Sequence, residues 1–170
     1  VMDATRHGSA FVMGYSMGGA IALRLASGHP NRVRALITGG VGETYFTRDQ
    51  NWRNAIAEAL LAGDIAELSP VQRMFRDFAA QPGKDPIALA ACMRAPRFNL
   101  GRDELAAIAA PALVVCGETD DVSGPAQPLA SALGNARALT VPKRDHMLTV
   151  GDKVYKQAVL DFLRQSNAGT

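Results

Sequence analysis

Residues 14–18 have the sequence GYSMG, a pentapeptide of the form G-x-S-x-G. An apolar run, Ala10 to Met13 (AFVM), precedes it, and a small-residue segment, Gly18 to Ser27 (GGAIALRLAS), follows it. Short apolar runs are typical of buried parallel strands, and small residues let a helix pack closely against a sheet. The pattern therefore predicts a strand, a sharp turn at Ser16 and a helix.

In a G-x-S-x-G turn of this kind the serine adopts a strained backbone conformation that exposes its hydroxyl group. Small residues two positions before and after it, here Gly14 and Gly18, let the chain turn sharply. The pentapeptide alone is weak evidence because glycine and serine are common, but the strand before it and the helix after it strengthen the interpretation. We therefore expect Ser16 to be a nucleophile.

Length and composition favour one globular domain. The chain has 170 residues, of which 48% are hydrophobic and 20% are charged, so a single core is expected over residues 1–170. The formal net charge of +2 is too small to favour a nucleic-acid or membrane partner. The basic residues are also scattered, without the interleaved aromatic residues of a single-strand-binding surface. We expect neither kind of partner.

The two cysteines indicate a reducing compartment. Cys92 and Cys116 lie in apolar surroundings without metal-site spacing, which predicts buried free thiols and no metal. The longest apolar stretch, Leu105 to Gly117, is interrupted by Pro111 and is shorter than the ~20 residues that span a bilayer. The first residues lack the apolar segment of a signal peptide. We therefore expect a cytoplasmic location.

Strand-like and helical segments alternate, which predicts an α/β fold with a parallel sheet and helices on its faces. Right-handed connections would place the carboxyl ends of the strands at one edge of the sheet, where sites on such folds form. The last helix, Val154 to Leu163, should face the sheet with Val154, Ala158 and the residues from Leu160 to Phe162. The predicted strands are Ala10–Tyr15, Val33–Thr38, Ala112–Cys116 and Ala136–Val141.

A long segment, Gly42 to Ala110, separates the second and third predicted strands. Trp52 to Ala62 has helical periodicity, and Ser69-Pro70 and Asp85-Pro86 each combine an N-cap residue with proline at the first helical position. Residues 42–110 are therefore predicted to be a helical insertion.

A serine hydroxyl needs a base to remove its proton. The chain has three histidines, and His7 and His29 precede predicted strands, which places them at the amino edge of the sheet. His146 follows the fourth strand, at the carboxyl edge where Ser16 should emerge. We therefore predict that His146 is the base.

The acid that orients this base should follow the third strand. The loop there offers three carboxylates, Glu118, Asp120 and Asp121, and at least two of them must be ordinary solvated groups. An acid near residue 120 gives the chain order serine, acid, histidine, which differs from the orders in chymotrypsin and subtilisin.

These features resemble the alpha/beta-hydrolase superfamily over nearly the whole chain, and most of all its small bacterial esterases, lactonases and cofactor-free haloperoxidases. The resemblance implies that Asp120, rather than Asp121, is the acid, that no cofactor is used, and that the four strands correspond to strands 5 to 8 of the family's eight. A serine nucleophile disfavours the dehalogenase branch, which uses aspartate. The matching motifs are GYSMGG at 14–19, HPNRVRALIT at 29–38, PALVVCGETDD at 111–121 and Asp145-His146.

The missing amino-terminal half has two expected consequences. The strand at 10–15 becomes an open edge, which we predict is covered by a second copy of the chain in a two-fold dimer. One oxyanion-hole donor is the backbone N–H of Met17, whereas the family's other donor comes from a loop that this sequence lacks; His7-Gly8 lies too close to the turn to replace it. Loss of one donor typically lowers turnover on the order of 100- to 1000-fold.

The expected function is hydrolysis of small or medium carboxylic esters through an acyl-enzyme on Ser16. Lactone hydrolysis, peracid formation and carbon–carbon bond cleavage stay open. The alternative is a weak or inactive half-domain that serves as an assembly or binding module. The insertion is expected to act as a lid, with one or two of its apolar side chains in contact with substrate and the others forming its core. The candidates are Trp52, Ile56, Leu60, Met74, Phe75 and Phe78.

Overall fold

The computed structural model describes residues 2–97 and 99–168. The chain divides into two compact units. The first, here called the sheet unit, comprises Val1–Phe46 and Asn99–Thr170, and the second, the helical unit, comprises Thr47–Phe98. The helical unit therefore lies within the segment 42–110 that the sequence marks as an insertion.

The sheet unit contains four parallel strands in the order β1-β2-β3-β4. The strands lie where the sequence predicts them, and β2 and β3 each extend one residue further, to a glycine. Tyr15 pairs with Gly39, and Gly117 pairs with Val141, so the strands end together at one edge. Their bounds are β1 Ala10–Tyr15, β2 Val33–Gly39, β3 Ala112–Gly117 and β4 Ala136–Val141.

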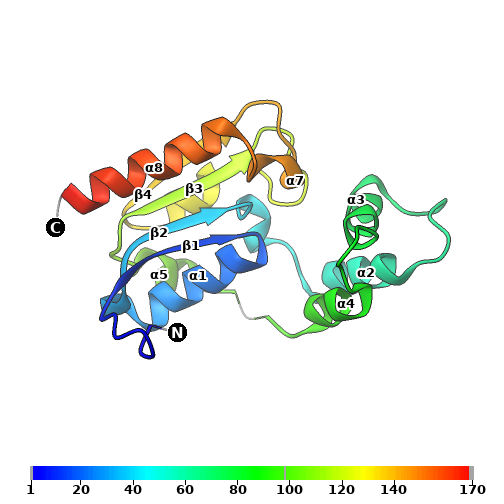
Figure 1. Cartoon of the computed structure of the whole chain (residues 1–170), viewed down its shortest axis with the longest axis horizontal. Helices are drawn as coiled ribbons and strands as arrows, with labels where there is room; N and C mark the ends of the chain where they lie inside the picture. The colour runs from blue at the N-terminus through cyan, green and yellow to red at the C-terminus, as the bar shows by residue number, and fades with distance from the viewer. Residues whose placement is uncertain (1, 98, 169–170) are drawn as a thin grey trace. The chain divides into compact units, whose positions relative to one another are not determined.

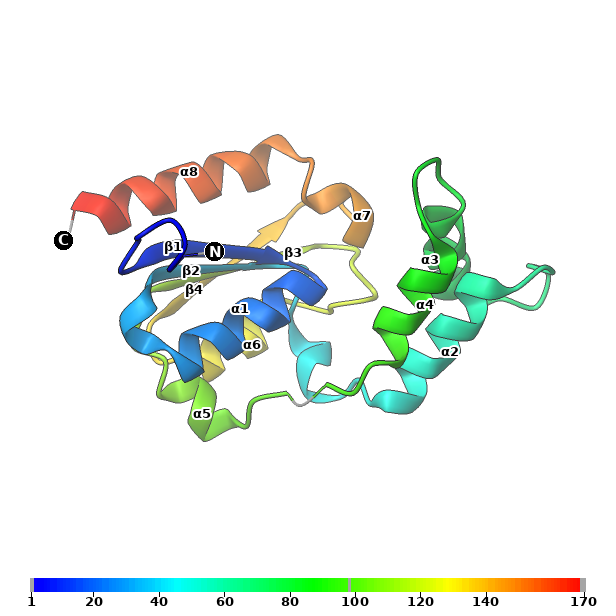
Figure 2. The same ribbon diagram turned by 60° about the horizontal axis from the view of Figure 1, so that its bottom comes forward.

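Helices cover both faces of this sheet (Figures 1 and 2). Three of them, α1 (Met17–Gly28), α5 (Arg102–Ala106) and α6 (Gln127–Ala132), pack on one face, where Leu23, Leu105 and Leu129 are fully buried. Helix α8 (Lys153–Ala168) covers the other face. The remaining elements of this unit are short: η1 Pro30–Arg32, η2 Glu43–Phe46 and α7 His146–Thr149.

Helix α8 faces the sheet with a different stripe from the predicted one. Tyr155, Val159 and Phe162 are buried against the sheet, whereas Val154 is 46% exposed and Leu160 is 48% exposed. The prediction was therefore wrong for Val154 and Leu160. The observed i, i+4, i+7 stripe buries two aromatic rings, which removes more apolar surface from water than the predicted stripe would.

The helical unit consists of α2 (Gln50–Leu61), α3 (Pro70–Ala79) and α4 (Pro86–Arg94). The predicted starts of α3 and α4 are confirmed: Ser69 forms a capping box with Gln72, and Asp85 accepts hydrogen bonds from two backbone N–H groups. Helix α2 begins two residues earlier than predicted because Asp49 caps it by accepting from the Trp52 N–H.

The helical unit has an apolar core of its own. Ile56 and Leu60 are buried in it, and Trp52 and Phe75 pack against it with their rings 6.2 Å apart. Of the side chains proposed to meet substrate, Ile56 and Leu60 therefore belong to the interior of this unit.

The two cysteines are both free thiols, but they differ in burial. Cys116 is buried in β3, as predicted, whereas Cys92 is exposed on α4, contrary to the prediction. The apolar neighbours of Cys92 in the sequence suggested burial, but α4 is a surface helix whose one buried residue is Ala90. Among the described residues, no helix is long and apolar enough to cross a membrane.

Strand β1 forms one edge of the sheet (Figure 1). Within the described part of the chain, β2 is its sole strand neighbour. Met13 on this strand is 49% exposed, and Met17 and Ile21 on the adjoining helix α1 are 42% and 59% exposed. An unpaired edge beside exposed apolar side chains is a surface that proteins usually cover.

Candidate active site

Ser16 occupies the turn between β1 and α1 and has φ of 52° and ψ of −116°. A positive φ is uncommon for a residue with a side chain and marks local strain. The backbone N–H of Ser16 donates a 2.7 Å hydrogen bond to the carbonyl of Gly39 at the end of β2, which holds the turn against the sheet. The expected sharp turn at Ser16 is thus present.

The glycines around this turn are not equivalent. A Cβ atom on Gly14 would collide with the backbone carbonyl of Gly18, so the turn requires glycine at position 14. A Cβ atom on Gly18 would meet nothing within 4 Å, whereas one on Gly19 would lie 2.7 Å from the side chain of Val41. The expectation that position 18 must be small for the turn is therefore wrong, and Gly19 is the glycine that the packing requires.

His146 begins the short helix α7, which follows β4. Asp145 caps this helix by accepting hydrogen bonds from the N–H groups of Met147 and Leu148. The cap fixes the position of His146, whose side chain is 3% exposed. Its Nε2 atom lies 3.0 Å from Ser16 Oγ, within hydrogen-bonding distance.

The other imidazole nitrogen of His146 faces Asp120. Nδ1 lies 3.0 Å from Asp120 Oδ2 and 3.2 Å from Oδ1. Because a carboxylate only accepts, Nδ1 carries the proton and Nε2 is left to accept from the Ser16 hydroxyl. Asp120 is 4% exposed, while its neighbour Asp121 is exposed and Glu118 accepts from the Lys143 N–H. Asp120 is therefore the carboxylate of this loop that bonds to His146.

Asp120 is held as an anion by several donors. Its Oδ1 atom accepts from the backbone N–H groups of Val122 and Ser123, and its Oδ2 atom accepts from the Ser123 hydroxyl at 2.5 Å. Burial by itself raises the pKa of Asp120, but the hydrogen bonds from His146 and Ser123 outweigh burial and leave the pKa below its ordinary value. The carboxylate is thus negatively charged near neutral pH, as an orienting acid should be.

Tyr15 and Ser123 also belong to this site, although the sequence did not single them out. Tyr15 lies beside the imidazole, with ring centroids 5.4 Å apart. The Asp120-x-x-Ser123 spacing after a strand is a usable signal, because aspartate in loops often accepts from N–H groups two and three residues on. Nothing in the sequence around Tyr15 indicates its contact with His146.

The match to a known family agrees with this geometry. Residues 1–155 match the model of the alpha/beta hydrolase family. The chain belongs to this family. It spans 67–68% of the length of the alpha/beta hydrolase structures compared below, while 95–96% of its own residues are covered.

Solved structures resembling this alpha/beta hydrolase come from several bacteria. A hydrolase from Pseudomonas aeruginosa PA01 is 26% identical, covers 95% of this chain and 67% of its own, and has a TM-score of 0.69. The enol-lactonase from Burkholderia xenovorans LB400 is 27% identical, with coverages of 96% and 68% and a TM-score of 0.66. A thermophilic esterase from Thermogutta terrifontis, 20% identical with coverages of 96% and 68% and a TM-score of 0.70, shares the fold.

Met17 is the first residue of α1 in this alpha/beta hydrolase. The first N–H groups of a helix have no acceptor within the helix, and they carry partial positive charge. The Met17 N–H belongs to this first turn and directly follows Ser16 in the chain. Within the described residues, no group of three or more His, Cys, Asp or Glu side chains is placed to hold a metal ion.

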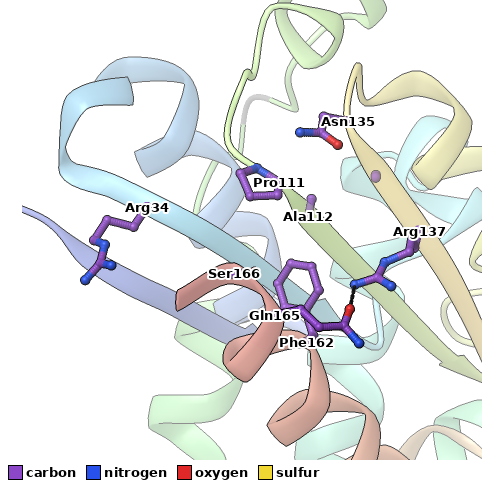
Figure 3. Close-up of a pocket in the computed structure, with 9 residues that line it drawn as sticks. Arg34, Pro111, Ala112, Asn135, Arg137, Phe162, Gln165 and Ser166 are labelled. Atoms are coloured by element: carbon purple, nitrogen blue, oxygen red, sulfur yellow. Dashed lines mark hydrogen bonds between the residues drawn. The ribbon is translucent and has the colours of Figure 1, made fainter. Parts of the chain in front are cut away.

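A hollow of about 500 Å³ lies at the opposite, amino-terminal ends of the strands (Figure 3). Asn135 and Arg137 border it near the start of β4, and Phe162 and Gln165 border it from α8. Arg137 donates a 2.8 Å hydrogen bond to the Gln165 side chain. None of the residues that border this hollow belongs to the Ser16 site.

Proposed function

We propose that this alpha/beta hydrolase cleaves carboxylic esters through an acyl-enzyme formed on Ser16. The observation that carries the proposal is the 3.0 Å distance between His146 Nε2 and Ser16 Oγ in a turn with positive φ. Asp120, His146 and Ser16 would act as acid, base and nucleophile, and the Met17 N–H would stabilise the oxyanion.

In the first half of the proposed reaction His146 Nε2 takes the proton of the Ser16 hydroxyl while Oγ bonds to the ester carbonyl carbon. The carbonyl oxygen becomes an oxyanion that accepts from the Met17 N–H. Asp120 stabilises the imidazolium that has formed. Collapse of the intermediate breaks the bond to the alcohol, which leaves with the proton from His146, and the acyl group stays on Ser16.

In the second half, water enters and His146 Nε2 removes one of its protons. The hydroxide oxygen bonds to the acyl carbon, and the second tetrahedral intermediate releases the carboxylic acid. The proton returns from His146 to Ser16 Oγ, which restores the starting state. No redox change occurs in either half.

Open-chain esters and lactones are the substrate classes to compare. The Burkholderia protein that is 27% identical over 96% of this chain is an enol-lactonase, and a lactone is a cyclic ester open to the same serine chemistry.

The helical unit is proposed to act as the lid. Trp52 and Phe75 are only partly buried in that unit, whereas Ile56 and Leu60 are buried in its core. A cytoplasmic location is part of the proposal.

The second candidate is a weak or inactive domain that serves in assembly or binding. The exposed β1 edge, with Met13 half exposed, is the observation that favours it. In that case the Ser16 site would be intact but without useful turnover.

Hydrolysis of p-nitrophenyl acetate and butyrate by the wild type and by Ser16→Ala separates the two candidates. The esterase proposal expects turnover that disappears in Ser16→Ala and labelling of Ser16 by a fluorophosphonate. Equal rates of ester hydrolysis in the two proteins would contradict the esterase proposal. The same comparison with an enol-lactone decides between open-chain and cyclic substrates.

A further inference from the structure

The Ser123 side chain is buried within the Ser16 site and contacts both partners of the Asp120–His146 pair. Its Oγ atom lies 2.5 Å from Asp120 Oδ2 and 3.1 Å from His146 Nδ1, and the residue is 2% exposed. Since a carboxylate cannot donate, the hydroxyl proton of Ser123 must point to Asp120. The lone pairs of Ser123 Oγ are then free to accept from the Nδ1–H of His146.

The loop around Ser123 is anchored from two directions. The Ser123 N–H donates to Asp120 Oδ1 at 2.8 Å, and its carbonyl accepts from the Thr44 N–H at 3.0 Å. The Thr44 hydroxyl donates to the carbonyl of Val122 at 2.7 Å. These bonds tie the loop after β3 to η2, so the Ser123 hydroxyl is fixed in place rather than being a freely rotating surface group.

We propose that Ser123 is a positioning residue that orients the imidazole of His146 through Asp120 and through a second acceptor for Nδ1–H. The inference rests on the proposed esterase function of Ser16. Three acceptor atoms, two on Asp120 and one on Ser123, surround the single proton of Nδ1. They hold the ring so that Nε2 faces Ser16 Oγ.

The Ser123 hydroxyl also reduces the negative charge on Asp120 that faces the His146 imidazole. By donating to Asp120, the hydroxyl takes up part of the negative charge of the carboxylate. Among the described titratable groups nearby, burial raises the pKa of Tyr15 and raises that of Cys116 to about 12, so both stay neutral while the enzyme works. The Asp145 carboxylate is engaged by the N–H groups of Met147 and Leu148.

The test compares Ser123→Ala, Ser123→Thr and Ser123→Val. Threonine keeps the hydroxyl, and valine has the shape of threonine without it. We expect kcat to fall about tenfold in Ser123→Ala and Ser123→Val with KM nearly unchanged, because a hydrogen bond to a charged group is lost. Ser123→Thr should restore kcat toward the wild type.

Proton NMR of the His146 Nδ1–H gives a readout that does not depend on turnover. The low-field resonance of this proton should move in Ser123→Ala and Ser123→Val but stay close to the wild-type position in Ser123→Thr. Equal effects of threonine and valine on kcat and the resonance, or no effect of Ser123→Ala on either, would overturn the inference. A moved resonance in a protein without Ser16-dependent turnover would leave the positioning geometry standing and reject the esterase function instead.

Discussion

The Tyr15 hydroxyl donates a 2.6 Å hydrogen bond to the backbone carbonyl of His146, 131 residues away in the chain. Tyr15 immediately precedes Ser16, so this bond ties the turn that carries the proposed nucleophile to the loop that carries the proposed base. Burial is the main reason that the pKa of Tyr15 is raised, and the hydroxyl therefore remains a donor throughout the working pH range.

Tyr15→Phe should weaken both the site and the fold. The change leaves the buried carbonyl of His146 without this donor, and we expect the free energy of unfolding to fall by about 1 kcal/mol. We also expect kcat for p-nitrophenyl butyrate to fall about 3- to 10-fold, because the distance between His146 and Ser16 is less well fixed. Urea denaturation and steady-state kinetics measure the two effects.

Tyr155→Phe is the matched control for that change. The Tyr155 ring packs edge-on against Tyr15, and its buried hydroxyl has no hydrogen-bond partner in the described part of the chain. Removing this hydroxyl should leave kcat unchanged and stability equal or higher. If the two variants behaved alike, the bond to the His146 carbonyl would have no special role.

Asp120 should make the stability of the protein depend on pH in acid. Its pKa is lowered in the folded state, so the unfolded chain binds more protons than the folded one near the ordinary aspartate pKa of 3.8. The contribution is complete above that value and is lost as the pH falls through the lower folded pKa. We expect Asp120→Asn to flatten the decline of unfolding free energy between about pH 5 and about pH 2.

Asp121→Asn is the control for Asp120→Asn, because it removes an exposed carboxylate from the next position. Because this variant keeps the Asp120 carboxylate, the decline of unfolding free energy that Asp120 causes should persist, as measured by thermal unfolding at each pH. Identical curves for the wild type and Asp120→Asn would show that Asp120 gains no net stabilisation from its hydrogen bonds.

Gly14→Ala and Gly18→Ala should have opposite outcomes although both glycines belong to the GYSMG motif. The methyl group of alanine at 14 would overlap the carbonyl of Gly18, and we expect a loss of about 1–3 kcal/mol or more. At 18 the methyl group enters open space within a helix, which should leave stability equal or raise it by up to about 1 kcal/mol. Calorimetry of the two variants measures both changes, and similar losses of stability in both would contradict the open space around Gly18.

Pairing of two chains through β1 is a further prediction. Met13 is half exposed on the edge strand, and lysine on an edge strand opposes pairing. If a dimer forms through β1, Met13→Lys should convert it to a monomer without loss of helix content. Sedimentation equilibrium of both proteins measures this, and a wild-type monomer at high concentration would rule the dimer out.

The sequence alone was enough to predict the positions of the four strands. The apolar-run pattern placed all four strands, because residue type along a short run is a local property of the sequence. The same holds for helix starts at Ser69-Pro70 and Asp85-Pro86, because a cap satisfies N–H groups only two or three residues away.

Tertiary structure decided what depends on residues far apart in the chain. It selected Asp120 among three carboxylates of one loop, because only geometry determines which of them reaches His146. It gave Tyr15 and Ser123 their contacts with His146, and it required glycine at 19 rather than 18. The sequence thus determined which residue types can carry the chemistry, and packing across the sheet edge decided which of them meet.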